Sequence, residues 1–148
     1  MKICLAGSGG GHLNELMQLK NAFEKYEHYF VTFQRPNSTE LAKKENVFFV
    51  ECPGRNPVKF LRNFIQSVKI FLKEKPDLII STGADAAVAT CIIGKIFGKK
   101  IIFIESFARV EELSLSGKII YPFADLFLVQ WDKLAEKYKK AVYGGPIY

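Results

Sequence analysis

Short apolar runs alternate with amphipathic segments along almost the whole sequence. The apolar runs are rich in isoleucine, phenylalanine and valine, which is typical of buried β-strands. Seven such runs predict strands at 2–7, 28–33, 47–52, 76–82, 99–106, 124–130 and 141–145. The intervening segments predict helices at 12–25, 38–45, 58–75, 85–97 and 131–140. A shorter helical region, interrupted by glycine and proline, precedes the sixth strand, and Ser38 is expected to cap the second helix.

This alternation predicts an α/β protein. Strands that are apolar on both faces belong in a parallel sheet with helices on either side. We therefore expect a Rossmann-like, doubly wound parallel sheet in one domain, 1–148. Ligands of such sheets bind beyond the carboxyl ends of the strands, where the strand order reverses. The loops Ser8–His12, Thr82–Asp85 and Glu105–Arg109 should then meet on one rim of the sheet.

The first of these loops, "GSGGGH", has the composition of an anion-binding turn. The backbone amides of Ser8, Gly9, Gly10 and Gly11 could face a phosphate at the start of the helix, with His12 beside them. A dinucleotide fingerprint needs a third glycine where His12 stands and an acidic residue after the second strand, where the sequence has "TFQR". No GK[ST] follows, so a Walker loop is excluded. The bland alternative is a tight turn with His12 as a helix cap.

The other two loops carry polar residues that each have a structural and a functional interpretation. Thr82 and Gly83 let the chain turn away from the fourth strand, and Asp85 either contacts a ligand or complements the helix dipole. Glu105 ends an apolar strand, where a carboxylate is costly unless it is hydrogen-bonded or functional. Arg109 could pair with Glu105 or bind a phosphate. The remaining candidate on this loop is Ser106.

The helix at 58–75 combines an apolar face with a strongly basic flank. The apolar face comprises Val58, Leu61, Phe64, Ile65, Val68, Phe71 and Leu72. Five basic residues accompany a single acidic one, a pattern that resembles a helix resting on an anionic membrane. The candidate membrane contacts are Lys59, Phe60, Arg62 and Lys69. The alternative is a helix that covers the sheet and exposes a solvated face, and the two interpretations are compatible.

Composition narrows the class of protein without identifying it. An excess of 21 − 15 = 6 positive charges suits an anionic partner such as a membrane, a nucleotide or a nucleic acid. The basic residues are dispersed and no nucleic-acid motif is present, so no nucleic-acid partner is expected. The three cysteines lack zinc-site spacing, and we expect them reduced, with Cys4 and Cys91 in the core. Neither a secretion signal nor a spanning helix is expected.

Three segments together resemble a known family. They are "GSGGGH", "STGADAAV" and the long stretch from "IFIESFARVEEL" to "AVYGGPI". They resemble bacterial capsular and exopolysaccharide glycosyltransferase accessory subunits of the CpsF/PssD kind. These are similar to the membrane-recruiting subunit of the eukaryotic dolichol-linked N-acetylglucosamine transferase. The resemblance implies the amino-terminal, acceptor-binding half of a split GT-B enzyme of the MurG type.

The resemblance also implies a reaction and a partner. A separate nucleotide-sugar-binding subunit would supply a UDP-sugar, which is transferred with inversion to a lipid-pyrophosphate-linked saccharide in capsule or exopolysaccharide synthesis. His12 would be the base or an acceptor contact, with Glu105 as the competing base, and the amides of Ser8–Gly11 would bind a pyrophosphate. No metal and no cofactor are implied, and the chain alone would be nearly inactive.

Location and alternatives follow from the same resemblance. The eukaryotic relatives typically carry an amino-terminal membrane segment, whereas the first strand here starts at Lys2. We therefore expect a cytoplasmic protein held peripherally, or through its partner, on the inner face of the plasma membrane. One alternative is a noncatalytic scaffold that recruits a sufficient partner enzyme. A stand-alone nucleotide-dependent enzyme is disfavoured by the missing acidic residue and glycine.

Overall fold

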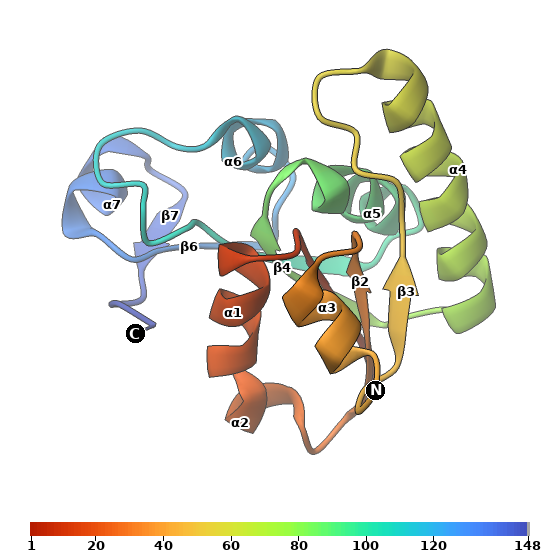
Figure 1. The fold of residues 1–148 in the computed structure, drawn as a ribbon. Helices are drawn as coiled ribbons and strands as arrows, with labels where there is room; N and C mark the ends of the chain where they lie inside the picture. Colours follow the sequence, from red (N-terminus) through yellow and green to blue (C-terminus); the bar gives the residue numbers. More distant parts are fainter. Residues whose placement is uncertain (148) are drawn as a thin grey trace.

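Seven strands form one sheet in the computed structural model, which describes residues 1–147. The order is β3-β2-β1-β4-β5-β6-β7, and every neighbouring pair is parallel (Figure 1). The strands are β1 (Lys2–Gly7), β2 (Glu27–Thr32), β3 (Val47–Phe49), β4 (Leu78–Gly83), β5 (Lys100–Ile104), β6 (Leu126–Val129) and β7 (Ala141–Tyr143). The predicted Rossmann-like parallel sheet is confirmed. Tyr148, which the predicted domain 1–148 includes, lies outside the described residues.

Helices cover both faces of this sheet. One face carries α1 (Gly11–Gln18), α2 (Lys20–Phe23) and α3 (Pro36–Leu41). The other carries α4 (Pro57–Glu74), α5 (Asp85–Ile96), α6 (Leu115–Ile120) and α7 (Asp132–Lys137). The chain winds outward from β1 to β3, crosses back through α4, and then winds the other way from β4 to β7. The strand order therefore reverses between β1 and β4, where doubly wound sheets bind ligands.

Burial on both faces explains why the strands are apolar at consecutive positions. Ile3 and Leu5 of β1 pack on the side of α1, whereas Cys4 and Ala6 pack on the side of α5. All four are at most 2% exposed. Cys4 and Cys91 lie in the core, as predicted, and burial raises the pKa of the Cys91 thiol to about 12. Both thiols are therefore poor sources of thiolate.

Several predicted helix boundaries are wrong, including those of the first two predicted helices. The helix predicted at 12–25 breaks at Leu19, where the backbone adopts φ −87° and ψ 9° and the Leu19 amide donates to the Leu16 carbonyl at 3.0 Å. The next helix begins at Pro36, not at Ser38, because proline fits the first helical turn. Ser38 therefore lies inside α3, and its Oγ accepts a hydrogen bond from the Arg35 amide at 2.8 Å.

α4 packs on the rest of the protein through a face that contains polar residues. Asn63, Ser67 and Phe71 are its buried residues. The Asn63 side-chain amide donates to the carbonyl oxygens of Glu51 at 2.7 Å and Ala86 at 3.3 Å. These bonds tie α4 to the end of β3 and to α5, and they satisfy a buried polar group that would otherwise be costly.

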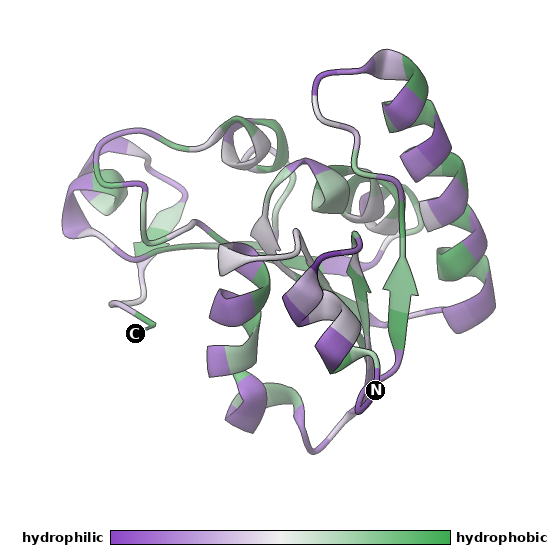
Figure 2. Cartoon of the chain, in the orientation of Figure 1, coloured by the Kyte–Doolittle hydropathy of each residue, from purple (hydrophilic) through white to green (hydrophobic). Residues whose placement is uncertain are grey.

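This packing leaves much of the predicted apolar face of α4 in solvent. Phe64, Val68 and Phe71 pack against the core, but four apolar residues spaced along one side of the helix stay exposed. They are Val58 (59%), Leu61 (58%), Ile65 (47%) and Leu72 (52%), and we call them the α4 stripe. Figure 2 shows green and purple residues interleaved along α4 at the outer edge of the molecule. One side of this helix therefore covers the rest of the fold, and membrane contact through its other side stays a prediction.

A charged cluster fixes the start of β6 against β5. The Asp125 carboxylate accepts a hydrogen bond from the Ile101 amide at 3.0 Å and pairs with Lys100 at 3.0 Å and Lys95 at 3.2 Å. The Ile101 amide first, and then the two lysines, lower the pKa of Asp125 to about 2. The folded state therefore favours the ionised carboxylate.

This lowered pKa predicts a pH-dependent contribution to stability. Because the folded pKa is below the ordinary value of 3.8, the contribution is present above about pH 4 and is lost as the pH falls towards 2. We expect Asp125→Asn to lower the free energy of unfolding by about 1 kcal/mol at pH 6 and by almost nothing at pH 2. Urea unfolding followed by circular dichroism across this pH range measures the difference. Glu24→Gln, on an exposed side chain, is the control, and a constant Asp125→Asn deficit from pH 6 to pH 2 would contradict the assignment.

Candidate functional site

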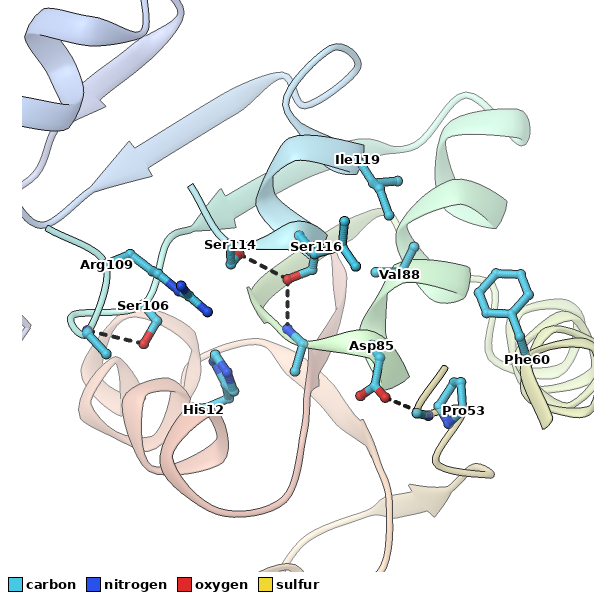
Figure 3. Close-up of a pocket in the computed structure, with 14 residues that line it drawn as sticks. His12, Pro53, Phe60, Asp85, Val88, Ser106, Arg109, Ser114, Ser116 and Ile119 are labelled. Atoms are coloured by element: carbon cyan, nitrogen blue, oxygen red, sulfur yellow. Dashed lines mark hydrogen bonds between the residues drawn. The ribbon is translucent and has the colours of Figure 1, made fainter. Parts of the chain in front are cut away.

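A cavity of about 450 Å³ lies at the carboxyl ends of β1, β4 and β5 (Figure 3). The three predicted loops contribute to it, and so do the start of α4 and the N-terminal part of α6. The lining residues are His12, Pro53, Gly54, Phe60, Ala84, Asp85, Val88, Ser106, Ala108, Arg109, Ser114, Leu115, Ser116 and Ile119. The convergence expected from the strand pattern is therefore present in the fold.

The cavity changes from polar to apolar along its length. Figure 3 shows one end lined by His12, Ser106 and Arg109. The opposite end is lined by Phe60, Val88 and Ile119. Phe60 belongs to the first turns of α4, and its ring centroid lies 6.5 Å from that of Phe64, which packs against the core. The apolar end of the cavity is thus lined partly by α4, the helix that carries the α4 stripe on another side.

The glycine loop forms the turn from β1 into α1 but does not line the cavity. Gly10 has a φ of +104°, which favours glycine. Its amide donates to Asn37 Oδ1 at 3.1 Å, and its carbonyl accepts from Asn37 Nδ2 at 3.1 Å. A side chain at Gly9 would overlap Arg35, and Ser8 is buried. Helix geometry leaves the amides of Gly11 and His12 at the start of α1 without intrahelical acceptors.

His12 is the titratable side chain that this loop brings into the cavity. Its side chain is 28% exposed, and its Nδ1 atom lies 3.5 Å from the Glu15 carboxylate. The His12 carbonyl accepts a hydrogen bond from Thr82 Oγ1 at 2.7 Å. Thr82 is fully buried, so this side chain holds the first two rim loops together from beneath the cavity.

Glu105, the competing base in the sequence analysis, is enclosed in the protein. Its side chain has no exposed surface. One carboxylate oxygen accepts from the Ser106 amide at 3.0 Å, and the other accepts from the Ser114 amide at 2.9 Å and Ser114 Oγ at 3.0 Å. A Cβ atom at Gly117 would overlap this second oxygen. The carboxylate joins β5 to the start of α6 and is not among the residues that line the cavity.

Some of the remaining predicted residues line the cavity with no ion pair in the described part of the chain, and others are held by hydrogen bonds or shape the backbone. Arg109 lines the cavity and makes no ion pair within residues 1–147, so the predicted pairing with Glu105 is absent. Asp85 accepts from the Gly54 amide at 2.7 Å and from the Ala86 amide at 2.9 Å. Gly83, with φ +97°, turns the chain beneath the cavity.

The sequence analysis missed three polar residues of the site. Glu15 is buried on α1 behind His12, and Ser114 and Ser116 line the cavity. Ser116 Oγ accepts a hydrogen bond from the Ala84 amide at 3.1 Å. The available signals were an acidic residue three positions after His12 and the "SLS" motif before a short helix.

The charged residues predicted as membrane contacts lie outside the cavity. Lys59, Arg62 and Lys69 are exposed on α4, and Lys59 lies 4.0 Å from Glu51. Within residues 1–147, no cluster of His, Cys, Asp or Glu has the arrangement of a metal site. The helices of this same part of the chain are all too short or too polar to cross a membrane.

Comparison with known proteins places the chain in a family. The family model described as "Oligosaccharide biosynthesis protein Alg14 like" matches residues 2–147. The chain belongs to the Alg14 family. A UDP-N-acetylglucosamine transferase subunit of Schizosaccharomyces pombe is 55% identical over 75 residues, covering 47% of this chain and 36% of that protein. The corresponding subunit of Yarrowia lipolytica is 31% identical over 173 residues, covering 97% of this chain and 80% of that protein.

A solved structure shows how the Alg14-family fold relates to a larger protein. MurG of Acinetobacter baumannii superimposes with a TM-score of 0.74 and 11% identity, over 90% of this chain and 43% of MurG. The Alg14-type chain therefore has the fold of less than half of that protein. The predicted resemblance to the eukaryotic transferase subunit is confirmed at the level of the family. Kinship with bacterial capsular subunits stays a prediction.

Removal of the Glu105 carboxylate tests its structural role. We expect Glu105→Ala to lower the free energy of unfolding by about 3 kcal/mol, because three donors lose a buried, charged acceptor. Chemical denaturation of the purified chain measures this loss. Glu111→Ala, on an exposed side chain of the following loop, is the matched control and should stay within about 0.5 kcal/mol of the parent. Equal stability of the two variants would rule out the structural role.

Proposed function

We propose that this chain is the acceptor-side subunit of a two-chain inverting glycosyltransferase. It binds a lipid-pyrophosphate-linked saccharide, and a separate chain binds the UDP-N-acetylglucosamine donor. The observation that carries the proposal is the graded cavity, whose polar end suits a pyrophosphate and sugar and whose apolar end is lined by Phe60, Val88 and Ile119. The names of the relatives, subunits of a UDP-N-acetylglucosamine transferase, support this donor.

The size of the chain supports a partner. It has the fold of 43% of MurG, so a second chain is needed to complete a fold of that size. A second chain placed across the rim would complete the crevice and bring the nucleotide-sugar to the polar end. We therefore expect little turnover from this chain alone. Nothing in the cavity or among the relatives favours a capsular product, so the proposal leaves the final polysaccharide open.

The chemistry requires a base on the acceptor side. The acceptor hydroxyl oxygen attacks the anomeric carbon of the donor sugar, the bond from that carbon to UDP breaks, and the configuration inverts. The hydroxyl proton passes to His12, which lines the cavity and carries a basic nitrogen. The enclosed Glu105 carboxylate has its oxygens occupied by donors and takes no part in this step.

Arg109 supplies the positive charge that the reaction needs. Its guanidinium lines the polar end of the cavity without an acidic partner among residues 1–147. It can therefore bind the acceptor pyrophosphate or stabilise the leaving diphosphate. The His12 amide, in the first turn of α1, is a further donor beside the same end. Ser106, Ser114 and Ser116 offer neutral hydroxyl groups along the path between the two ends.

The α4 stripe gives the protein a surface for a membrane. Arg62 lies four residues after Val58, and Lys69 lies four residues after Ile65, so each basic residue neighbours the stripe on the helix. An apolar stripe beside basic residues is the arrangement of a helix that rests on anionic lipid. Phe60, also predicted as a membrane contact, lines the cavity, and its contact with lipid stays a prediction. We infer peripheral attachment on the cytoplasmic side.

The second candidate is a scaffold that recruits a catalytically sufficient partner. Under this alternative, substitutions in the cavity leave turnover unchanged, and only surface changes that break docking reduce it. Arg109, which has no acidic partner among residues 1–147, and the cavity-facing His12 favour the catalytic proposal, because docking alone needs neither group in a concave site.

Substitution of His12 distinguishes the two candidates. In the reconstituted pair we expect His12→Gln to lower kcat by about 10²- to 10⁴-fold with little change in the KM for the UDP-sugar. His28→Gln, which removes the other histidine of the chain, should keep nearly full turnover. Steady-state rates with a lipid-linked acceptor and a panel of UDP-sugars provide the measurement. Wild-type turnover by His12→Gln would favour the scaffold.

Vesicle binding tests the membrane surface. Loss of about 1 kcal/mol per basic residue predicts that Arg62→Gln with Lys69→Gln weakens binding to vesicles containing phosphatidylserine about 30-fold. The control pair Lys43→Gln with Lys44→Gln removes the same charge from an exposed segment after α3. Flotation of the purified chain measures the bound fraction. Equal effects of the two pairs would indicate net charge alone and reject a role for α4.

A further inference from the structure

Glu15 is a buried carboxylate whose two oxygens have unequal surroundings. The residue is 3% exposed. Its Oε1 atom accepts hydrogen bonds from Ser106 Oγ at 3.1 Å and from the Phe107 amide at 2.9 Å. Its Oε2 atom has no hydrogen-bond partner within residues 1–147 and lies 3.5 Å from His12 Nδ1. A buried carboxylate oxygen without a donor is costly, so its neighbour matters.

His12 Nδ1, like Glu15 Oε2, lacks a hydrogen-bond partner among the described residues. It is also buried. Two adjacent buried groups, one an acceptor and the other able to carry a proton, satisfy each other when Nδ1–H donates to Glu15 Oε2. The separation is long for a hydrogen bond, as is common for catalytic pairs without bound substrate. This pairing leaves Nε2 as the atom through which the ring can accept a proton.

We propose that Glu15 is the positioning residue that holds His12 in the tautomer protonated at Nδ1. The inference rests on the proposed function, because only a base that acts through Nε2 needs this tautomer. The carboxylate also orients the ring, since its Oε1 is fixed to the loop that carries Arg109. Glu15 thereby fixes the position of His12 relative to Arg109 at the polar end of the cavity.

The other charged groups around the cavity do not replace Glu15. Asp85 is occupied by the amides of Gly54 and Ala86. Glu105 is occupied by the Ser106 and Ser114 donors. Arg109 has only hydrogen-bond donors and cannot accept a hydrogen bond from Nδ1–H. Within residues 1–147, Glu15 is therefore the acidic group within ion-pair distance of His12.

The isosteric substitution Glu15→Gln makes a directional test. The Phe107 amide can donate only to an oxygen, so it holds the glutamine oxygen at the former Oε1 position. The glutamine NH₂ group must then face His12 Nδ1. A donor at that position turns Nδ1 into an acceptor and moves the ring proton to Nε2. The substitution should thus reverse the tautomer without removing the contacts to the loop.

The experiment measures the tautomer and the turnover separately. The chain has two histidines, so ¹H–¹⁵N spectra of the imidazole nitrogens at about pH 8 can be assigned with His28→Gln. We expect a proton on His12 Nδ1 in the parent and on Nε2 in Glu15→Gln. In the reconstituted pair we expect kcat to fall about 10²-fold or more, with the KM for the UDP-sugar nearly unchanged.

Glu45→Gln is the matched control, because Glu45 lies 3.3 Å from Nε2 of the other histidine, His28. It should leave the His12 spectrum and the turnover unchanged. An unchanged His12 tautomer in Glu15→Gln overturns the inference, and so does parent-like kcat with a reversed tautomer. Failure of the proposed function looks different: His12→Gln would then keep full turnover, whatever tautomer the spectra report.

Discussion

Parallel strands impose the constraint on which the site depends, because every strand of the sheet ends at the same edge. β1, β4 and β5 are adjacent, and the chain leaves each of them at the rim that forms the cavity. The reversal of strand order between β1 and β4 keeps the connections from covering this part of the rim. Residues as far apart in sequence as His12 and Arg109 line one cavity for this reason.

Two buried carboxylates hold the loop that follows β5, where the hydrogen bonds of the sheet no longer fix the backbone. Ser106 lies between them: its amide donates to Glu105 at 3.0 Å, and its hydroxyl donates to Glu15 at 3.1 Å. Glu105 fixes this loop to α6, while Glu15 fixes it to α1. A loop held from both sides loses little conformational entropy when a ligand arrives, which is how rigid sites keep their binding energy. The two buried carboxylates therefore act first by fixing the position of the Ser106 loop.

The sequence predicted the elements and the rim well, because both follow from patterns that sheets impose. Alternation of apolar and amphipathic segments is a sum over many residues, so errors such as the break at Leu19 move boundaries without changing the fold. The packed face of α4 was beyond such reasoning, since Asn63 enters the core through specific hydrogen bonds. Glu15 was missed for a similar reason. On a helix an acidic residue ordinarily faces solvent, and only tertiary contacts reveal its burial.

The packing of α4 determines which of its sides faces the cavity, proposed to bind the acceptor, and which side forms the surface proposed to meet the membrane. Had the helix buried its most apolar side, Val58 and Leu61 would have faced the core. Because Asn63 and Ser67 occupy that position instead, the apolar residues point outward, and Phe60, on the same side of the helix as Asn63, lines the apolar end of the cavity. A lipid-linked acceptor could then keep its chain near the membrane surface while its pyrophosphate reaches Arg109. Under the proposed function, the polar residues on the packed side of α4 thereby determine where a hydrophobic substrate can enter.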